Sequence, residues 1–249
     1  MKCNDNEENV MHYINSSNLS DYAFLNEDTL VFPLKAVCIC FHGYTDATML
    51  DKSNNIARVL GKNGIAWVFP YYSVWAWMSK SSQIFNEQVI DAVYERLGAD
   101  SSVPLIVSGG SMGGLTALNY LVYGKREAIG CAVNCPVTDM VRIFEDKPSF
   151  RRAILSAHIE NESPLDEILA SYSPVRFAKK LPDIPYFLVF GESDTYFTQM
   201  QMPPLIEKLK ELDLRHTLLV QPGMNHCDIE GHPEALRSFC DFIVSLTDA

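Results

Sequence analysis

A serine in a glycine-rich turn is the residue of this chain whose setting most favours nucleophilic chemistry. Ser111 is flanked by Gly109-Gly110 and Met112-Gly113, and the apolar run Leu105–Val107 ends one residue before this turn. The G-x-S-x-G pattern raises a serine onto a strained turn between a strand and a helix, where its hydroxyl is exposed for attack. The glycines leave room where a β-carbon would clash with the neighbouring backbone. Such a serine needs an oxyanion loop upstream, and an acid and then a histidine downstream.

A carboxylate follows the serine at the end of a later apolar run. Tyr186–Phe190 has the composition of a buried strand, and the polar turn Gly191-Glu192-Ser193-Asp194 comes directly after it. A carboxylate at this place can orient a histidine and stabilise its cation. Asp194 is the favoured acid. Glu192, two residues earlier, and Asp139, after the preceding strand, are the alternatives.

The general base is expected in the loop after the last apolar strand. His226 ends the segment Gln221-Pro222-Gly223-Met224-Asn225-His226, a glycine-containing loop that can return the imidazole to Ser111. The competitor His232 directly precedes Pro233, as is typical of a residue at a helix start. His42 comes before the serine in the chain, so we expect it to brace its own loop by hydrogen bonding.

Two backbone N–H groups are expected to form an oxyanion hole. Phe41-His42-Gly43-Tyr44 ends the first long apolar strand, and the simplest donor from the loop there is the Tyr44 amide. Met112 follows the serine at the positive end of the next helix and supplies the second amide. The Tyr44 hydroxyl is an alternative donor to the same oxyanion.

Short apolar runs alternate with helical patterns, which predicts an α/β fold with helices on both faces of a mostly parallel sheet. The expected strands are Ala36–Phe41, Ile65–Pro70, Leu105–Ser108, Ile129–Asn134, Tyr186–Phe190 and Thr217–Val220. The expected helices are Ser82–Leu97, Met112–Tyr123, Pro204–Leu212 and Pro233–Leu246. At one edge of the sheet, Tyr22–Leu25 and Thr29–Phe32 are expected to form a hairpin.

Residues 137–180 interrupt this alternation. The segment is rich in charged and aromatic residues, contains Pro148, Pro164 and Pro174, and offers two short helical patterns. It is too short for a second domain, so we expect one α/β domain over residues 1–249 that carries a small helical cap at the carboxyl edge of the sheet. An ordinary surface excursion is the alternative.

The composition excludes some classes of partner. A formal net charge of −11 argues against nucleic acids and anionic membranes, because binding phosphate requires clustered lysine and arginine. Apolar residues at 47% and charged residues at 20% are ordinary for a compact soluble protein. No run approaches the roughly 18 apolar residues of a membrane helix. No secretory signal is visible, so a cytoplasmic location is expected.

Several of the seven cysteines lie in apolar, strand-like runs, Cys38, Cys40 and Cys131 among them. They are expected to be buried thiols in a reducing compartment. Cys131 and Cys135 lack a matching Cys/His pair in the sequence, so no metal site is expected. The polar run Asn4–Asn9 has nothing to bury and is expected to be mobile.

The order Ser111, Asp194, His226 resembles that of the α/β-hydrolase superfamily, and the resemblance extends over nearly the whole chain. The segments Gly109–Gly114 and Ser173-Pro174-Val175 look like the catalytic domain of the prolyl oligopeptidase family. The resemblance implies a serine hydrolase that uses the residues named above, without a metal or organic cofactor. The chain leaves no room for the propeller of larger family members. Esterase and peptidase activity both stay open, with an ester the favoured substrate.

Two groups of residues are candidates for substrate binding. The aromatic loop Tyr71–Met78 follows the second parallel strand, and its Trp75 and Trp77 are candidates to line an acyl pocket. Alternatively, these rings fill the gap beneath the cap. Arg142, with Arg151 and Arg152, is a candidate to bind a substrate carboxylate, or else these arginines pair with Glu145 and Asp146. The expected substrate is a small ester or a short peptide.

Overall fold

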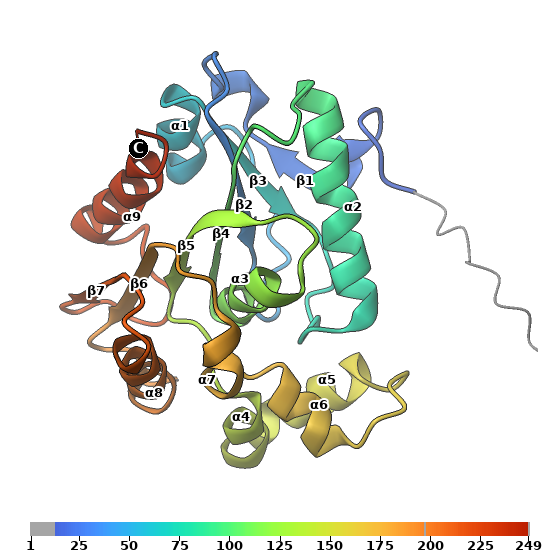
Figure 1. Ribbon diagram of the computed structural model, residues 1–249, viewed down its shortest axis with the longest axis vertical. Coiled ribbons are helices and arrows are strands. Elements are labelled where there is room, and N and C mark those ends of the chain that lie inside the picture. The colour runs from blue at the N-terminus through green and yellow to red at the C-terminus, as the bar shows by residue number, and fades with distance from the viewer. Residues whose placement is uncertain (1–12, 197, 249) are drawn as a thin grey trace, which may run out of the picture.

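The computed structural model describes residues 13–196 and 198–248, so the polar run Asn4–Asn9 lies outside the described residues. In this part of the chain a seven-stranded sheet has the order β1-β3-β2-β4-β5-β6-β7 (Figure 1). β1 pairs with β3 in antiparallel orientation, and every other neighbouring pair is parallel. The strands are β1 (Ala23–Leu25), β2 (Ala36–Phe41), β3 (Ile65–Pro70), β4 (Leu105–Gly110), β5 (Ala128–Asn134), β6 (Tyr186–Gly191) and β7 (His216–Gln221).

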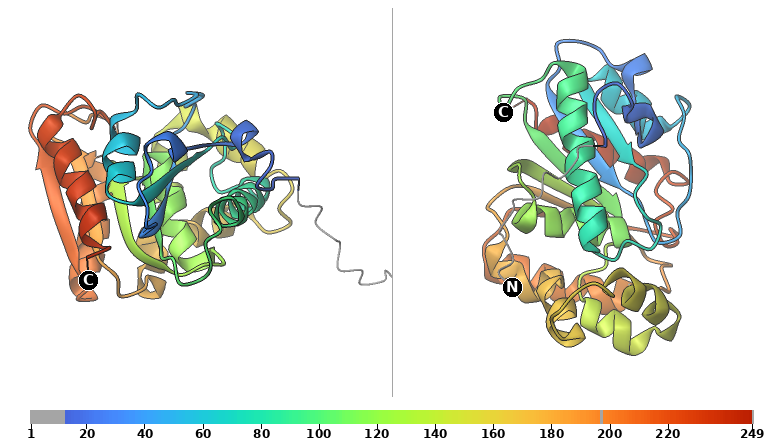
Figure 2. Two further views of the ribbon diagram at one scale, coloured as in Figure 1. Left: turned by 90° about the horizontal axis from the view of Figure 1, so that it is seen from above. Right: turned by 90° about the vertical axis from the view of Figure 1, so that its right-hand side faces the viewer.

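Helices cover both faces of the sheet, which confirms the predicted α/β fold (Figure 2). α1 and α9 pack on one face, where Leu60 and Ile243 are fully buried. α2, α3 and α8 pack on the other face through side chains such as Val93, Leu115 and Leu209. Burial of each such side chain stabilises the fold by about 1.5–3 kcal/mol. These helices are α1 (Asn55–Lys62), α2 (Lys80–Leu97), α3 (Met112–Tyr123), α8 (Thr198–Glu211) and α9 (Pro233–Ser245).

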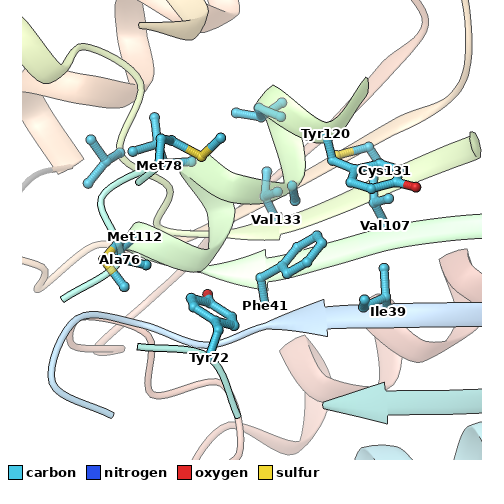
Figure 3. Close-up of a cluster of buried hydrophobic side chains, with 14 of the residues drawn as sticks. Ile39, Phe41, Tyr72, Ala76, Met78, Val107, Met112, Tyr120, Cys131 and Val133 are labelled. Carbon is cyan, nitrogen blue, oxygen red and sulfur yellow. The ribbon is translucent and has the colours of Figure 1, made fainter. Parts of the chain in front are cut away.

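A buried cluster beneath the start of α3 fixes the helix against the sheet (Figure 3). The ring of Phe41, the last residue of β2, lies 6.2 Å from that of Tyr72 and 6.1 Å from that of Tyr120. Met112, the first residue of α3, is fully buried in the same cluster. The carboxyl end of β2 and the amino end of α3 are therefore held together by packing.

The predicted hairpin at the sheet edge is wrong. Only Ala23–Leu25 forms a strand, and Glu27–Thr29 is a turn of 3-10 helix. The reason is Asn26, which is buried and bonds the sheet directly. Its Oδ1 accepts from the Trp67 N–H at 2.8 Å, and its Nδ2 donates to the carbonyls of Ala57 and Ile65. The side chain thus bonds β3 where β1 would otherwise have continued, and the chain turns into the 3-10 helix instead of returning as a strand.

Two helices also differ from expectation. Asn55–Lys62 was not predicted to be helical, although Asn54 caps it by accepting a hydrogen bond from the Ala57 N–H. α8 begins at Thr198 rather than at Pro204, so both of its prolines lie inside the helix. None of the helices in the described ranges is long and apolar enough to cross a membrane.

The insert forms four short helices instead of the two predicted: α4 (Met140–Asp146), α5 (Pro148–Ala157), α6 (Leu165–Ser171) and α7 (Pro174–Phe177). They lie together at one end of the molecule (Figure 1). Phe150 of α5 packs its ring 5.1 Å from that of Tyr44 and 5.4 Å from that of Trp77. Since Tyr44 follows β2 and Trp77 follows β3, the insert contacts the carboxyl edge of the sheet.

Candidate active site

Ser111 occupies a strained turn between β4 and α3, with φ 55° and ψ −119°. Such left-handed values are uncommon for a residue with a side chain and persist only where the surroundings enforce them. Here the Ser111 N–H donates to the Asn134 carbonyl at 2.9 Å, and the Ser111 carbonyl accepts from the Val137 N–H at 3.0 Å. A β-carbon on Gly113 would overlap the Phe41 carbonyl, so only glycine fits there.

A chain of hydrogen bonds joins the predicted serine, histidine and acid. His226 Nε2 lies 2.9 Å from Ser111 Oγ, and His226 Nδ1 lies 2.8 Å from Asp194 Oδ2. Because a carboxylate only accepts, Nδ1 carries a proton, and in the neutral imidazole Nε2 accepts from the serine hydroxyl. The Asp194 side chain is fully buried, and its Oδ1 accepts from the Tyr196 N–H at 2.8 Å. The structure therefore brings together the three residues in the arrangement that nucleophilic catalysis requires.

The surroundings of His226 favour its protonated form. Burial on its own disfavours the charged imidazole, but the hydrogen bond to Asp194, a hydrogen bond with Cys135 and the Asp194 charge outweigh it. Together they raise the pKa of His226 to about 9. An imidazolium formed by proton transfer from Ser111 is stabilised by the same partners.

Met112 directly follows Ser111, and a β-carbon built on Gly43, the neighbour of Tyr44, would lie 3.6 Å from that of Ser111. Met112 is the first residue of α3, so its N–H has no acceptor within the helix. Tyr44 lines the same pocket as Ser111, in the loop that follows β2. The Tyr44 ring packs against Trp77 at 5.5 Å and against Phe150 of the insert at 5.1 Å.

The two alternative acids, Glu192 and Asp139, are engaged or exposed elsewhere. Glu192 is exposed at the turn after β6. Asp139 caps α4 by accepting from the Arg142 N–H at 3.2 Å, and it pairs with Arg176 at 3.6 Å.

The other two histidines considered as the base, His42 and His232, have different contacts. His42 is buried, and its ring nitrogens lie 2.9 Å from the Gly43 carbonyl and 3.1 Å from the Tyr72 carbonyl. It thus braces the loop after β2. His232 stands at the start of α9, with Nε2 3.9 Å from an Asp228 oxygen.

A pocket of about 450 Å³ opens beside Ser111. Much of its lining is apolar and includes Cys40, Leu50, Ile56, Trp67, Phe69, Ile229 and Phe239. Two carboxylates, Asp46 and Glu230, lie among its polar lining residues. None of the described residues that line it is a lysine or arginine.

The three residues predicted for substrate binding do not line this pocket. Trp77 is buried and donates its backbone N–H to the Met112 sulfur at 3.3 Å. Trp75 is 43% exposed and borders a separate hollow against the end of α5. Arg142 pairs with Asp146 at 3.6 Å, four residues along the same helix. Trp77 thus packs against Phe150 of the insert, whereas Trp75 is partly exposed beside it.

Two of the residues that line the pocket, Asp46 and Glu230, were not predicted from the sequence. Asp46 follows β2 by five residues, and Glu230 follows His226 by four, so both come after strand ends at the edge that carries Ser111. Their position after predicted strands was the sequence feature that could have identified them as lining residues.

Two cysteines beside His226 were also missed. The nitrogen of His226 and the sulfurs of Cys135 and Cys227 all lie within 4.8 Å of one another. A hydrogen bond from the Cys227 thiol lowers the pKa of Cys135.

One protein-family model matches most of this chain. The model of the prolyl oligopeptidase family matches residues 87–248, more than half of the chain and a range that contains Ser111, Asp194 and His226. The chain belongs to the prolyl oligopeptidase family. It is therefore a serine hydrolase, as the resemblance implied. No curated protein sequence matched significantly.

Solved structures share the fold at low sequence identity. A truncated carbohydrate esterase from gut microbiota is similar at 14% identity and a TM-score of 0.70, covering 88% of both chains. The fluorophosphonate-binding serine hydrolase F of Staphylococcus aureus is similar at 17% identity and a TM-score of 0.65, covering 88% of this chain and 86% of that one. Acylaminoacyl peptidase of Pyrococcus horikoshii is similar at 16% identity and a TM-score of 0.66, and the match covers 86% of this chain and 37% of the peptidase chain. These likenesses confirm the α/β-hydrolase fold.

Proposed function

We propose that this serine hydrolase cleaves carboxylic esters, with Ser111 as nucleophile, His226 as general base and Asp194 as the acid that orients it. The observation that carries the proposal is the continuous hydrogen-bond chain from Asp194 through His226 to Ser111, at 2.8 and 2.9 Å. It ends on a serine held at φ 55° on the turn that opens α3.

In the first step the Ser111 oxygen attacks the ester carbonyl while its proton passes to His226 Nε2. The buried Asp194 carboxylate stabilises the imidazolium through Nδ1. The imidazolium then gives the proton to the leaving alcohol, which departs as an acyl-enzyme forms on Ser111.

In the second step the acyl-enzyme is hydrolysed. His226, again neutral, takes a proton from water, and the resulting hydroxide attacks the acyl carbon. The carboxylic acid leaves and the proton returns to Ser111. In both steps negative charge develops on the former carbonyl oxygen. The Tyr44 and Met112 amides are the proposed donors to that oxyanion.

An ester is favoured over a peptide by the size and walls of the pocket. Its volume of about 450 Å³ and its largely apolar lining suit a short acyl or alkyl group. The two similar structures named as an esterase and a serine hydrolase are also covered over 88% and 86% of their lengths. The similar acylaminoacyl peptidase is covered over only 37%.

A second candidate is an aminopeptidase that acts on small peptides. The carboxylates of Asp46 and Glu230 beside the nucleophile are suited to bind a peptide's terminal ammonium group. Under this alternative the scissile bond would be the amide next to that terminus, and the same three residues would do the chemistry.

The decisive experiment compares the two substrate classes on wild-type protein and on Ser111→Ala. We expect hydrolysis of short-chain nitrophenyl esters, labelling of Ser111 by a fluorophosphonate probe, and little cleavage of amino-acyl anilides. Ser111→Ala should lower turnover by a factor on the order of 10⁶ and abolish labelling. An anilide preference would instead establish the peptidase, and esterase activity retained by Ser111→Ala would refute the mechanism.

We further propose that the protein works in the cytoplasm. The free cysteines of the described chain, Cys38 and Cys131 in its core among them, support a reducing environment.

A further inference from the structure

Three soft ligand groups converge beside the proposed nucleophile. Cys135 directly follows β5, while His226 and Cys227 are neighbours in the loop after β7. Their ligand atoms, two thiol sulfurs and one imidazole nitrogen, all lie within 4.8 Å of one another. The proposed mechanism uses only the imidazole, so two nucleophilic sulfurs at the centre of the site are left without a role.

The backbone holds both thiols in place. Cys135 has φ 46° and donates its N–H to the Val189 carbonyl at 2.8 Å, which ties it to β6. Cys227 has φ 58°, and its sulfur lies 3.4 Å from the Asn134 carbonyl oxygen. Cys135 is buried, whereas Cys227 lines the same pocket as Ser111. An ion can therefore reach the Cys227 sulfur from the pocket that admits substrate, and the buried Cys135 sulfur lies within 4.8 Å of it.

The ligand atoms, two sulfurs and one nitrogen, determine which kind of metal ion would bind. Thiolate and imidazole ligands suit zinc and other thiophilic cations, whereas magnesium and calcium require oxygen ligands. Zinc binds sulfur at about 2.3 Å and nitrogen at about 2.0–2.1 Å, so neighbouring ligands of a tetrahedral ion lie roughly 3.3–3.8 Å apart. A cluster already within 4.8 Å needs to contract by only about 1 Å to reach that spacing.

We propose that Cys135, His226 and Cys227 form an inhibitory site for a thiophilic divalent cation of the zinc type. His226 Nδ1 is bound to Asp194, so Nε2 is the nitrogen left for the ion. That nitrogen is the one that faces Ser111 Oγ. The ion and the serine proton therefore compete for one lone pair, and the metal-bound enzyme has no general base. The inhibition, though not the binding, rests on the proposed function of His226.

Binding is tested first, because it needs no catalysis. Wild-type protein, stripped of metal and kept reduced with a phosphine, is titrated with zinc against a chromophoric chelator. We expect one zinc per chain, and with cobalt a thiolate-to-metal charge-transfer band. Cys135→Ser, Cys227→Ser and the double variant should bind at least about tenfold more weakly, since even changes around a ligand cost about 10–100-fold. Cys240→Ser, which alters a buried thiol of α9, is the matched control.

Inhibition is tested on the same proteins with a nitrophenyl ester. Zinc should abolish wild-type and Cys240→Ser activity, a chelator should restore it, and the double variant should resist at least about tenfold more zinc. Fluorophosphonate labelling of each variant verifies that its active site has folded. Absence of zinc binding, or equal zinc sensitivity in wild type and double variant, would overturn the proposal. Cysteine-dependent binding by a chain that cleaves no ester would leave the metal site standing and refute the proposed function.

Discussion

Gly191 and Met224 are in direct backbone contact where β6 ends and the loop carrying His226 passes over it. A β-carbon built on Gly191 overlaps the Met224 carbonyl group. The same carbonyl accepts a hydrogen bond from the Ser193 N–H at 3.1 Å. The turn that carries Asp194 and the loop that carries His226 are thus layered on each other, which allows their side chains to meet at 2.8 Å.

Gly191→Ala is therefore expected to separate the acid from the base. We expect a loss in kcat/KM of more than about hundredfold and a destabilisation of about 1–3 kcal/mol from overpacking. Gly223→Ala in the same loop is the control, because its β-carbon meets open space and only its φ of 69° is unfavourable. That change should cost about 1–2 kcal/mol and leave most activity. Ester kinetics and thermal melts measure both effects; equal activity of the two variants would show that the contact is dispensable.

The acid can be identified by comparing two neighbouring carboxylates. Asp194→Asn should lower kcat by about 10⁴-fold, because an amide cannot hold the required tautomer of His226 or stabilise its cation. Glu192→Gln, at the exposed position two residues earlier, should leave kcat within about twofold of wild type, as most surface changes have small effects. The reverse ranking in steady-state kinetics would assign the acid to Glu192.

The pH dependence follows from the raised pKa of His226. Only the neutral imidazole accepts the Ser111 proton, so activity is lost as the pH falls through that pKa. We expect kcat/KM for a neutral ester to rise into the alkaline range, with a midpoint above the ordinary histidine value of 6.5 and toward 9. The residual activity of Asp194→Asn should show a lower midpoint, since a main cause of the shift is gone. A wild-type midpoint at or below 6.5 would contradict the assignment.

Substrate charge should be discriminated by the pocket carboxylates. Asp46 is half-buried, and Glu230 is exposed and accepts from Asn54 Nδ2 at 2.9 Å. Esters that carry a cationic group should be preferred over anionic ones of equal size. Removal of both charges, in Asp46→Asn with Glu230→Gln, should shrink that preference by about five- to tenfold, corresponding to about 1 kcal/mol for a solvated ion pair. Kinetics at low and high salt measure it; a preference unchanged by the double substitution would exclude these carboxylates.

The sequence was sufficient to predict the elements that carry the site and the three residues that meet there. The reason is that Ser111, Asp194 and His226 each follow an apolar strand, and parallel strands bring their carboxyl ends to one edge. The strand before Ser111 and the helix after it are consecutive, so local pattern alone predicts the turn.

Features that depend on distant contacts were not predictable in the same way. The hairpin prediction was wrong because the Asn26 side chain accepts a hydrogen bond from the Trp67 N–H, 41 residues away in the chain. Cys135 and Cys227 share no spacing signature because they meet only through the pairing of β5, β6 and β7. Trp77 belongs to an aromatic loop, but its burial against Phe150 depends on how the insert folds back.

Tyr44, Trp77 and Phe150 form a mutual contact of three rings, with centroids 5.1 to 5.5 Å apart. Their residues come from three separate stretches of chain: the loop after β2, the loop after β3, and α5. The insert is thus not a module that can be exchanged between relatives without consequence. A graft that displaces the Phe150 ring removes a packing partner of Tyr44, whose amide is the proposed oxyanion donor, so a swap intended to alter specificity is expected to change turnover as well.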